Sequence, residues 1–292
     1  MDRMTRRRQV ASQLVLVPVA VFVLAPIWIL VILATDASIT GLPDAFRLLP
    51  AEPTLERLVE AWVRPDRTLD FMGLLRNSLF VAGCAAGASL LLGASLAYAF
   101  ARMRFPGNRA GLLAVLVGAF LPPVALAVPI YFIFLALENS VPGLREIGFR
   151  GSTVALAILY ASFAMPLCVW LMRSAFRAVP AELEEAAFVE GATRATAFRK
   201  VTLPLAAPSI LVAVLVAFLL AYSEFALAWL FASKEENVTL AMELAGAQIG
   251  FYATSWGPTA AHALLMTIPV VVVFIALQRM LLRGSLAATA TD

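Results

Sequence analysis

The sequence predicts an all-α membrane protein with six transmembrane helices, and three observations lead to this fold class. First, 62% of the 292 residues are hydrophobic and only 14% are charged, which is more apolar than a soluble chain of this length. Second, the chain contains six apolar stretches of the length that crosses a bilayer, which is about 20 residues. Third, arginine and lysine are concentrated in alternate connecting segments.

The six apolar stretches leave no room for a long soluble domain. The first is longer and more interrupted by proline than the core of a signal peptide, and no small-residue cleavage site follows it, so we expect a retained helix. Both cysteines, Cys84 and Cys168, lie within the stretches, which favours buried apolar packing over a disulfide framework. The approximate limits of the six spans are 13–35, 77–100, 111–136, 152–172, 209–231 and 259–281.

The basic residues predict the orientation of these spans. Segments rich in arginine and lysine are held on the cytoplasmic side of a membrane, and here they include both ends of the chain. We therefore expect both termini to face the cytoplasm. The basic residues on that side are Arg3, Arg6, Arg7, Arg8, Arg102, Arg104, Arg109, Arg173, Arg177, Arg194, Arg199, Lys200, Arg279 and Arg283.

The first outer loop, residues 36–70, contains a pattern typical of a short amphipathic helix. Thr54 can cap such a helix, and apolar residues follow it at helical spacing. The helix could contact a partner outside the cell or simply cover the helical bundle. Its predicted apolar residues are Leu55, Leu58, Val59 and Trp62.

Glycine and proline give the second and third spans distinct characters. Gly83, Gly87 and Gly93 in the second span allow neighbouring helices to pack closely in lipid. The third span contains Pro122, Pro123 and Pro129, which predict a broken helix. Backbone groups freed by such a break must be buried in protein or line a wet cavity, so this span is either the wall of a pathway or a static kink.

A polar segment between the fourth and fifth spans, residues 182–208, predicts two short helices separated by a hinge. Pro180 can occupy a first helical position, and the glutamates that follow place negative charge near the positive end of the helix. Gly191 suits the left-handed residue that ends a helix, and Thr193 can then cap a second one. Helix chemistry alone is equally satisfied by an ordinary interfacial hairpin.

The same segment resembles the cytoplasmic EAA loop of binding-protein-dependent ABC importer permeases. That signature is Glu-Ala-Ala, three residues, Gly, and then Phe and Leu-Pro with a later Pro. The matching residues, in order and spacing, are Glu185, Ala186, Ala187, Gly191, Ala192, Phe198, Leu203, Pro204 and Pro208. Glu190 stands where the family often has Asp. The resemblance implies that this segment, with Glu182, forms a coupling helix that docks into a cleft on a separate ATPase subunit.

The resemblance extends over essentially the whole chain and points to the maltose-type carbohydrate branch. It implies a type I importer permease fold: residues 1–76 form the basic arm, first helix and periplasmic loop, and residues 77–281 form a core of five transmembrane helices that includes the EAA loop, 174–208. The tail, 282–292, lacks the Gly-rich ending common in that branch, so a contact between the tail and the ATPase is not supported.

The partners and the location also follow from the resemblance. It implies a heterodimer with a second permease, two ATPase subunits that bind ATP and Mg²⁺, and a periplasmic or lipid-anchored solute-binding protein. The location would be the bacterial inner membrane, which the chain crosses several times. The solute would be a sugar or oligosaccharide, and a polyamine or a phosphate ester is the alternative.

The residues needed for catalysis are missing from the sequence, so we expect a transport subunit without its own ATPase site. The lysines are Lys200 and Lys234, and neither follows Gly as a phosphate-binding loop requires. His262 is the single histidine, which we interpret as a packing or hydrogen-bonding residue because one histidine cannot form a metal site. We therefore expect no cofactor or metal on this chain. An intramembrane enzyme and an ion-coupled carrier are the weaker alternatives.

Glu224 is the carboxylate that lies within an apolar span. An ionised carboxylate is costly there unless it is paired or hydrated. The phrase Ser223-Glu224-Phe225 resembles a recurrent Asn-Glu-Phe phrase of the family, which favours a role in the fold or in gating. Aromatic residues near the spans could line a substrate pathway, although packing and interface anchoring explain them equally well. The pathway candidates are Tyr131, Phe132, Trp170, Tyr222, Glu224 and Trp229.

Overall fold

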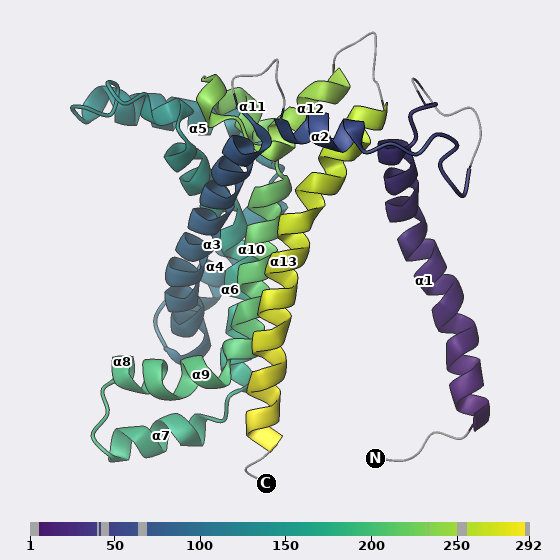
Figure 1. Cartoon of the computed structure of the whole chain (residues 1–292). Coiled ribbons are helices and arrows are strands. Elements are labelled where there is room, and N and C mark those ends of the chain that lie inside the picture. The colour runs from purple at the N-terminus through teal and green to yellow at the C-terminus, as the bar shows by residue number, and fades with distance from the viewer. Residues whose placement is uncertain are drawn as a thin grey trace. The chain divides into compact units, whose positions relative to one another are not determined.

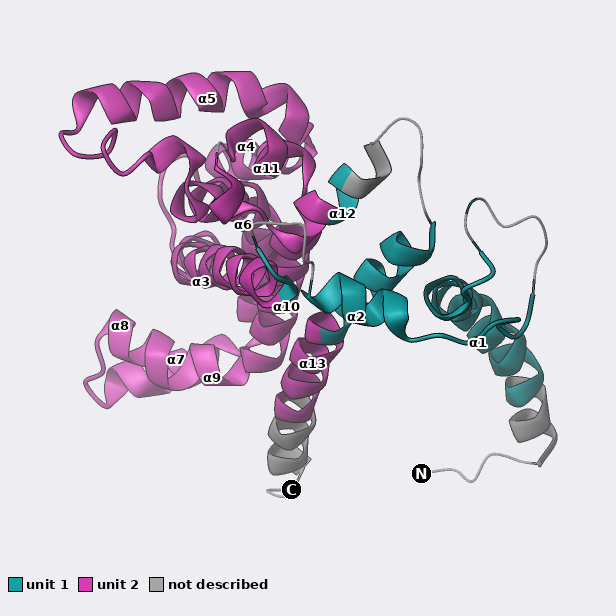
Figure 2. Ribbon diagram, turned by 45° about the horizontal axis from the view of Figure 1, so that its top comes forward, with its two compact units in different colours: residues 1–71, 244–268 teal, residues 72–243, 269–292 magenta. Residues whose placement is uncertain are grey.

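The computed structural model describes residues 6–39, 41, 47–63, 69–232, 234–249 and 256–289. Arg3 of the predicted basic arm and residues 290–292 of the predicted tail lie outside these residues. Within the described ranges the secondary structure is helical, with one isolated antiparallel bridge between Asp36 and Pro53. The chain divides into two compact units, which Figure 2 colours separately: Met1–Phe71 with Leu244–Ile268, and Met72–Glu243 with Pro269–Asp292.

The helices follow one another along the chain as Figure 1 labels them. The elements are α1 (Arg6–Thr35), α2 (Glu56–Val63), α3 (Phe71–Arg102), α4 (Asn108–Phe120), α5 (Pro123–Ser140), the 3₁₀ turn η1 (Phe149–Gly151), α6 (Thr153–Ala178), α7 (Ala181–Val189), α8 (Arg194–Ala197), the π-helical turn η2 (Phe198–Thr202), α9 (Leu203–Leu205), α10 (Ala207–Ser223), α11 (Ala226–Phe231), the 3₁₀ turn η3 (Glu235–Asn237), α12 (Leu240–Ile249) and α13 (Trp256–Thr289).

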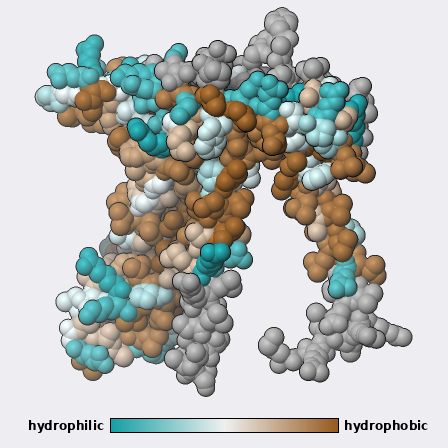
Figure 3. Space-filling view, viewed as in Figure 1, coloured by the Kyte–Doolittle hydropathy of each residue, from teal (hydrophilic) through white to brown (hydrophobic). Residues whose placement is uncertain are grey.

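Five of these helices are long and apolar enough to cross a membrane, and the count becomes six when one bent pair is taken as a single span. The five are Gln13–Thr35 in α1, all of α3, α5 and α6, and Trp256–Met280 in α13. The bent pair joins Arg194–Leu205 to Ala207–Ser223 at an angle of 81°. Apolar side chains cover the middle of the helices in Figure 3, and polar ones gather at the ends. The predicted all-α membrane fold is confirmed.

Two predicted spans are interrupted. The stretch 111–136 is divided between α4 and α5, because Leu121 and Pro122 adopt extended conformations and so end one helix before the next begins. This is the break that the prolines predicted. In the stretch 209–231, α10 ends at Ser223 and α11 begins at Ala226, with Glu224 extended between them. This second break was not predicted, since neither Pro nor Gly marks it in the sequence.

The second unit is built around α6, which has half of its span buried. The hydroxyl of Ser89 in α3 donates to the carbonyl of Ala161 in α6, with 3.2 Å between the oxygens. Gly93 permits this close approach, because a Cβ there would lie 3.0 Å from Cε of Met172. Among the described residues no atom would lie within 4 Å of a Cβ at Gly83 or Gly87, so the predicted close packing is confirmed within this chain only at Gly93.

The two cysteines have different environments. Cys168 in α6 is buried, and its thiol donates to the carbonyl of Ala213 in α10 at 3.5 Å. Cys84 in α3 is exposed, so the prediction of buried packing is confirmed for Cys168 and wrong for Cys84. Both are free thiols.

The first unit contains the predicted amphipathic helix, α2. Its Leu58 and Ala61 pack against a small core that includes Leu33 and Ala260, and the hydroxyl of Thr54 accepts from the amide of Glu56 at 3.1 Å. Trp62 stacks on Phe71, with ring centroids 5.0 Å apart. The other predicted apolar residues, Leu55 and Val59, are 67% and 59% exposed. The helix was therefore predicted correctly, but only part of its apolar face lies inward.

Buried polar groups fix the end of α1 within this unit. The carboxylate of Asp36 is fully buried and accepts from the backbone amides of Ser38, Ala51 and Glu52. Burial by itself would raise the pKa of Asp36, but these hydrogen bonds, with one from the Ser38 hydroxyl, hold the pKa well below its usual range.

His262 is also buried and meets Phe71 edge to face at 5.9 Å, which confirms its interpretation as a packing residue.

Candidate functional site

The helix α7 carries the EAA-like sequence and ends as predicted. Gly191 has a φ of 88°, in the left-handed region. Its amide donates to the carbonyl of Phe188 at 3.0 Å, and the amide of Ala192 donates to the carbonyl of Ala187 at 2.9 Å. These two bonds form a Schellman motif, which satisfies the last carbonyls of the helix and reverses the chain.

The second short helix also begins as predicted. The hydroxyl of Thr193 accepts from the amide of Thr196 at 3.3 Å and caps α8. A single turn of π-helix, η2, follows, and such turns are rare insertions within α-helices. The chain then bends at Ala206 into α10. Within the second unit, α7, α8 and α9 lie together at one end of the long helices, while α5 and α11 lie at the opposite end (Figure 1).

Glu184 attaches α7 to the long helices. Its side chain is 7% exposed and its Oε1 lies 3.2 Å from Nε of Arg102, the last residue of α3. Tyr98, one turn earlier in α3, donates its hydroxyl to Oε2 of Glu184 at 3.2 Å. The buried hydroxyl of Thr202 in η2 also donates to Oε1. One carboxylate thus joins α7, α3 and η2.

Aromatic rings pack around Tyr98, which donates to this buried carboxylate. The ring of Phe198 in η2 lies 4.5 Å from that of Tyr98 and 5.6 Å from that of Phe176 in α6, measured between centroids. Tyr98 and Phe176 meet edge to face at 6.1 Å. Of the predicted coupling residues, Phe198 therefore has a structural position, packed against α3 and α6 through Tyr98 and Phe176.

Most of the predicted coupling residues are exposed. The inward-facing residue of α7 is Glu184, whereas Leu183 is 45% and Val189 89% exposed. The apolar residues of α7 therefore point outward, which is unusual for a helix that packs on a bundle and typical of a surface that meets a partner. The exposed predicted residues are Glu182, Glu185, Ala186, Gly191 and Pro204, and the partly buried ones are Ala187, Ala192, Phe198 and Leu203.

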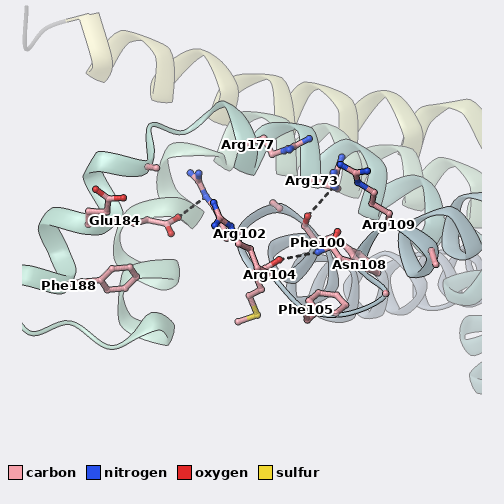
Figure 4. A pocket seen from close by; sticks show the side chains of 16 residues that line it. Phe100, Arg102, Arg104, Phe105, Asn108, Arg109, Arg173, Arg177, Glu184 and Phe188 are labelled. Carbon is pink, nitrogen blue, oxygen red and sulfur yellow. Dashed lines mark hydrogen bonds and ion pairs between the residues drawn. The ribbon is translucent and has the colours of Figure 1, made fainter.

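A pocket of about 1140 Å³ lies beside α7 (Figure 4). Its walls come from the ends of α3 and α6, the start of α4 and the inner side of α7. The turn between α3 and α4 also contributes, and Gly107 there has a φ of 82°, a conformation that glycine adopts readily in tight turns. The lining includes Phe100, Arg102, Arg104, Phe105, Asn108, Arg109, Arg173, Arg177, Glu184, Glu185 and Phe188.

Sequence reasoning missed the residues that anchor α7. Glu184 was seen as one of three glutamates at the start of a helix, and nothing distinguished it from its neighbour Glu185. Arg102 was used for the charge distribution alone, and neither Tyr98 nor Thr202 was singled out. The helical register gave no signal either, since Glu184 and Glu185 are equally far around the helix from the face that carries Leu183 and Ala186.

The pathway candidates differ in their surroundings. Phe132, Trp170 and Trp229 are 61%, 52% and 45% exposed, and Tyr222 is buried and stacked on Phe218 at 5.5 Å. Tyr131 contacts Phe231 in α11 at 6.0 Å and has the guanidinium of Arg150 over its ring at 4.6 Å. None of the six candidates lines the pocket beside α7.

Glu224 occupies the break between α10 and α11. Its carboxylate accepts from the amide of Leu227 at 3.0 Å and from the hydroxyl of Tyr160 in α6 at 2.6 Å. It also accepts from the amide of Ala228 at 3.4 Å. The carboxylate therefore satisfies the free amides at the start of α11, which explains how a polar group is accommodated within an apolar stretch.

Comparison with known proteins identifies the family. The model of the family described as "binding-protein-dependent transport system inner membrane component" matches residues 89–285, from the middle of α3 through most of α13. The chain belongs to this family. The matched region of this family member contains α7, its attachment through Glu184 and the pocket beside it.

Named relatives cover most of this permease. The diacetylchitobiose uptake system permease protein DasC of Streptomyces coelicolor is 34% identical over 73% of this chain and 74% of its own length. The trehalose transport system permease protein SugB of Mycobacterium tuberculosis is 32% identical over 73% of this chain and 75% of its own. The maltose/maltodextrin transport system permease protein MalG of Escherichia coli is 34% identical over 72% of this chain and 69% of its own.

Solved structures share the fold. A chain from the crystal structure of a bacterial ABC transporter involved in the import of the acidic polysaccharide alginate superposes with a TM-score of 0.66. The match covers 96% of this permease and 99% of that chain, at 18% sequence identity. The methionine transporter MetNI in an inward-facing conformation gives a TM-score of 0.56 at 19% identity.

Proposed function

We propose that this permease imports a sugar or oligosaccharide and that α7 receives the movement of an ATPase subunit. The proposal rests on the difference between the two sides of α7. Its inner side is fixed to α3 and η2 through Glu184, and its outer side exposes Leu183, Ala186 and Val189. A helix that is rigidly attached on one side and open on the other can transmit the motion of a partner to the membrane helices.

The choice of solute rests on the relatives. Three relatives that match most of this chain are named for diacetylchitobiose, trehalose and maltose or maltodextrin, all of which are di- or oligosaccharides. A sugar is therefore the favoured substrate class. Glu224 does not favour an ion-coupled carrier, because its carboxylate is used by the amides of α11 and by Tyr160.

In the proposed assembly, this chain pairs with a second permease to enclose the pathway. Two ATPase subunits bind ATP and Mg²⁺, and a solute-binding protein delivers the sugar on the opposite side. The sequence lacks a phosphate-binding loop, so ATP would be hydrolysed by the partners. Both termini and α7 would face the cytoplasm, since the basic residues are concentrated on that side.

Crosslinking in intact membranes tests the coupling role. A cysteine is introduced by Ala186→Cys in a chain that also carries Cys84→Ser, because Cys84 is the exposed thiol. We expect a thiol-specific bifunctional reagent to join this residue to the ATPase subunit. Asn139→Cys, at an exposed position in α5 and at the opposite end of the second unit, is the matched control and should not react with that subunit. Failure of Ala186→Cys to capture it would contradict the proposal.

A further inference from the structure

The pocket beside α7 contains more arginine than the protein neutralises. Five arginines line it, together with two glutamates. The carboxylate of Glu184 is already used by Arg102, Tyr98 and Thr202, and Glu185 is exposed. Among the residues that the structure describes, Arg104, Arg109 and Arg177 have no carboxylate within ion-pair distance, and all three are exposed.

These arginines lie where membrane helices end. Arg102 is the last residue of α3, Arg177 lies in the last turn of α6 and Arg109 lies in the first turn of α4. Figure 4 shows Arg109, Arg173 and Arg177 on one side of the pocket, with Arg102 between them and Glu184. The guanidinium groups of three helices thus face a shared space near the predicted boundary of the bilayer.

The same pocket has an apolar wall. Phe100, Phe105 and Phe188 belong to its lining, and Phe105 and Phe188 are 40% and 39% exposed. The pocket therefore offers guanidinium groups and aromatic rings side by side. A guanidinium group matches phosphate oxygens with two parallel hydrogen bonds, which makes arginine the usual residue for recognising a phosphate.

We propose that this pocket binds the phosphate group of an anionic phospholipid, with the glycerol and the first carbons of the acyl chains against the aromatic wall. Its volume of about 1140 Å³ exceeds what a single phosphate ion fills. A free phosphate would satisfy the arginines alone, whereas a phospholipid satisfies both parts of the lining. Basic pockets between membrane helices bind anionic head groups in this way. The lipid would belong to the inner leaflet of the membrane. This assignment alone rests on the orientation given under the proposed function.

The test measures lipid retention by the full-length chain, purified with its partner subunits. Native mass spectrometry compares phosphatidylglycerol with phosphatidylcholine bound to the wild type, to a pocket variant and to a control variant. The pocket variant combines Arg104→Gln, Arg109→Gln and Arg177→Gln. The control combines Arg194→Gln, Arg199→Gln and Lys200→Gln, which removes the same charge on the same predicted side but outside the pocket. Thermal unfolding checks that each variant is folded, and Arg109→Gln alone replaces the pocket variant if it is not.

We expect the wild type and the control to retain phosphatidylglycerol over phosphatidylcholine, and the pocket variant to bind it at least about tenfold more weakly. Added inorganic phosphate should not release the lipid. Equal retention by all three proteins would overturn the proposal, and release by inorganic phosphate at constant ionic strength would assign the pocket to free phosphate. The measurement requires neither transport nor ATP hydrolysis, so its failure is distinct from failure of the proposed function.

Discussion

Nε of Arg102 and Oε1 of Glu184 lie 3.2 Å apart, so the last residue of α3 is ion-paired with the inner side of α7. Both side chains are largely buried, at 16% and 7% exposed. Removing one partner of a buried pair leaves the other charge without compensation, which costs more than the pair contributes when intact. The attachment of α7 should therefore be sensitive to Glu184 and insensitive to its exposed neighbours.

The first prediction concerns this attachment. Glu184→Ala should weaken the attachment of α7 by about 3 kcal/mol, because Arg102, Tyr98 and Thr202 lose their shared acceptor. Amide hydrogen exchange in α7 should then be roughly 100-fold faster where exchange occurs by local opening. The control is Glu185→Ala, which removes an exposed carboxylate and should leave the exchange rates unchanged. Equal rates in both variants would show that Glu184 does not anchor the helix.

The second prediction concerns the left-handed turn at Gly191. Nothing lies within 4 Å of a Cβ at this position, so conformation and not space limits substitution. Gly191→Val should destabilise the turn by about 1–2 kcal/mol or more, whereas Gly191→Asn should be tolerated, because asparagine adopts this conformation more readily. In membranes, ATP hydrolysed per solute transported should rise for the valine variant and remain near the wild-type value for the asparagine variant. A wild-type ratio of ATP hydrolysed to solute transported in the valine variant would show that the turn at Gly191 has no role in coupling.

The third prediction concerns pH. The pKa of Asp36 is lower in the folded protein than in the unfolded chain, where an aspartate titrates near 3.9, so the unfolded state binds more protons between the two values. The stabilisation is fully present above about pH 4 and is lost as the pH falls toward the folded pKa. Thermal unfolding of Asp36→Asn should therefore depend less on acid than that of the wild type. Glu60→Gln, an exposed carboxyl in α2, is the control that should keep the wild-type profile.

The fourth prediction concerns the break before α11. Glu224→Ala should destabilise α11 by about 1 kcal/mol, the usual loss when a capping acceptor is removed. Glu224→Gln keeps one acceptor oxygen and should have a smaller effect. The measurement is the rate of solute uptake by each variant, divided by the amount of protein inserted in the membrane. A third variant, Tyr160→Phe, removes only the hydrogen bond that α6 donates to Glu224. Identical uptake by the alanine and wild-type chains would argue against a role for the cap.

Local backbone signals in the sequence were reliable. Gly191, Thr193 and the prolines around Pro122 each act on their own backbone, so the ends of α7, α8 and α4 could be predicted without knowledge of the tertiary contacts. The membrane fold was equally accessible, since it depends on composition and on the length of apolar stretches.

The orientation of side chains around the membrane helices could not be predicted in the same way. When both sides of a helix are apolar, the pattern does not tell the face toward protein from the face toward lipid, so Cys84 was expected inside, whereas it is exposed. The break at Glu224 was also hidden, because its cause is a carboxylate that meets Tyr160 from another helix.

The attachment of α7 uses residues of this polypeptide alone: Glu184, Arg102, Tyr98 and Thr202. The helix is consequently formed and attached before any neighbour arrives. Association with that neighbour then requires little ordering of the backbone. The chain has already lost, on folding, the conformational entropy that a disordered loop would lose on binding its target. Such a prefolded contact can separate and re-form in every transport cycle without unfolding.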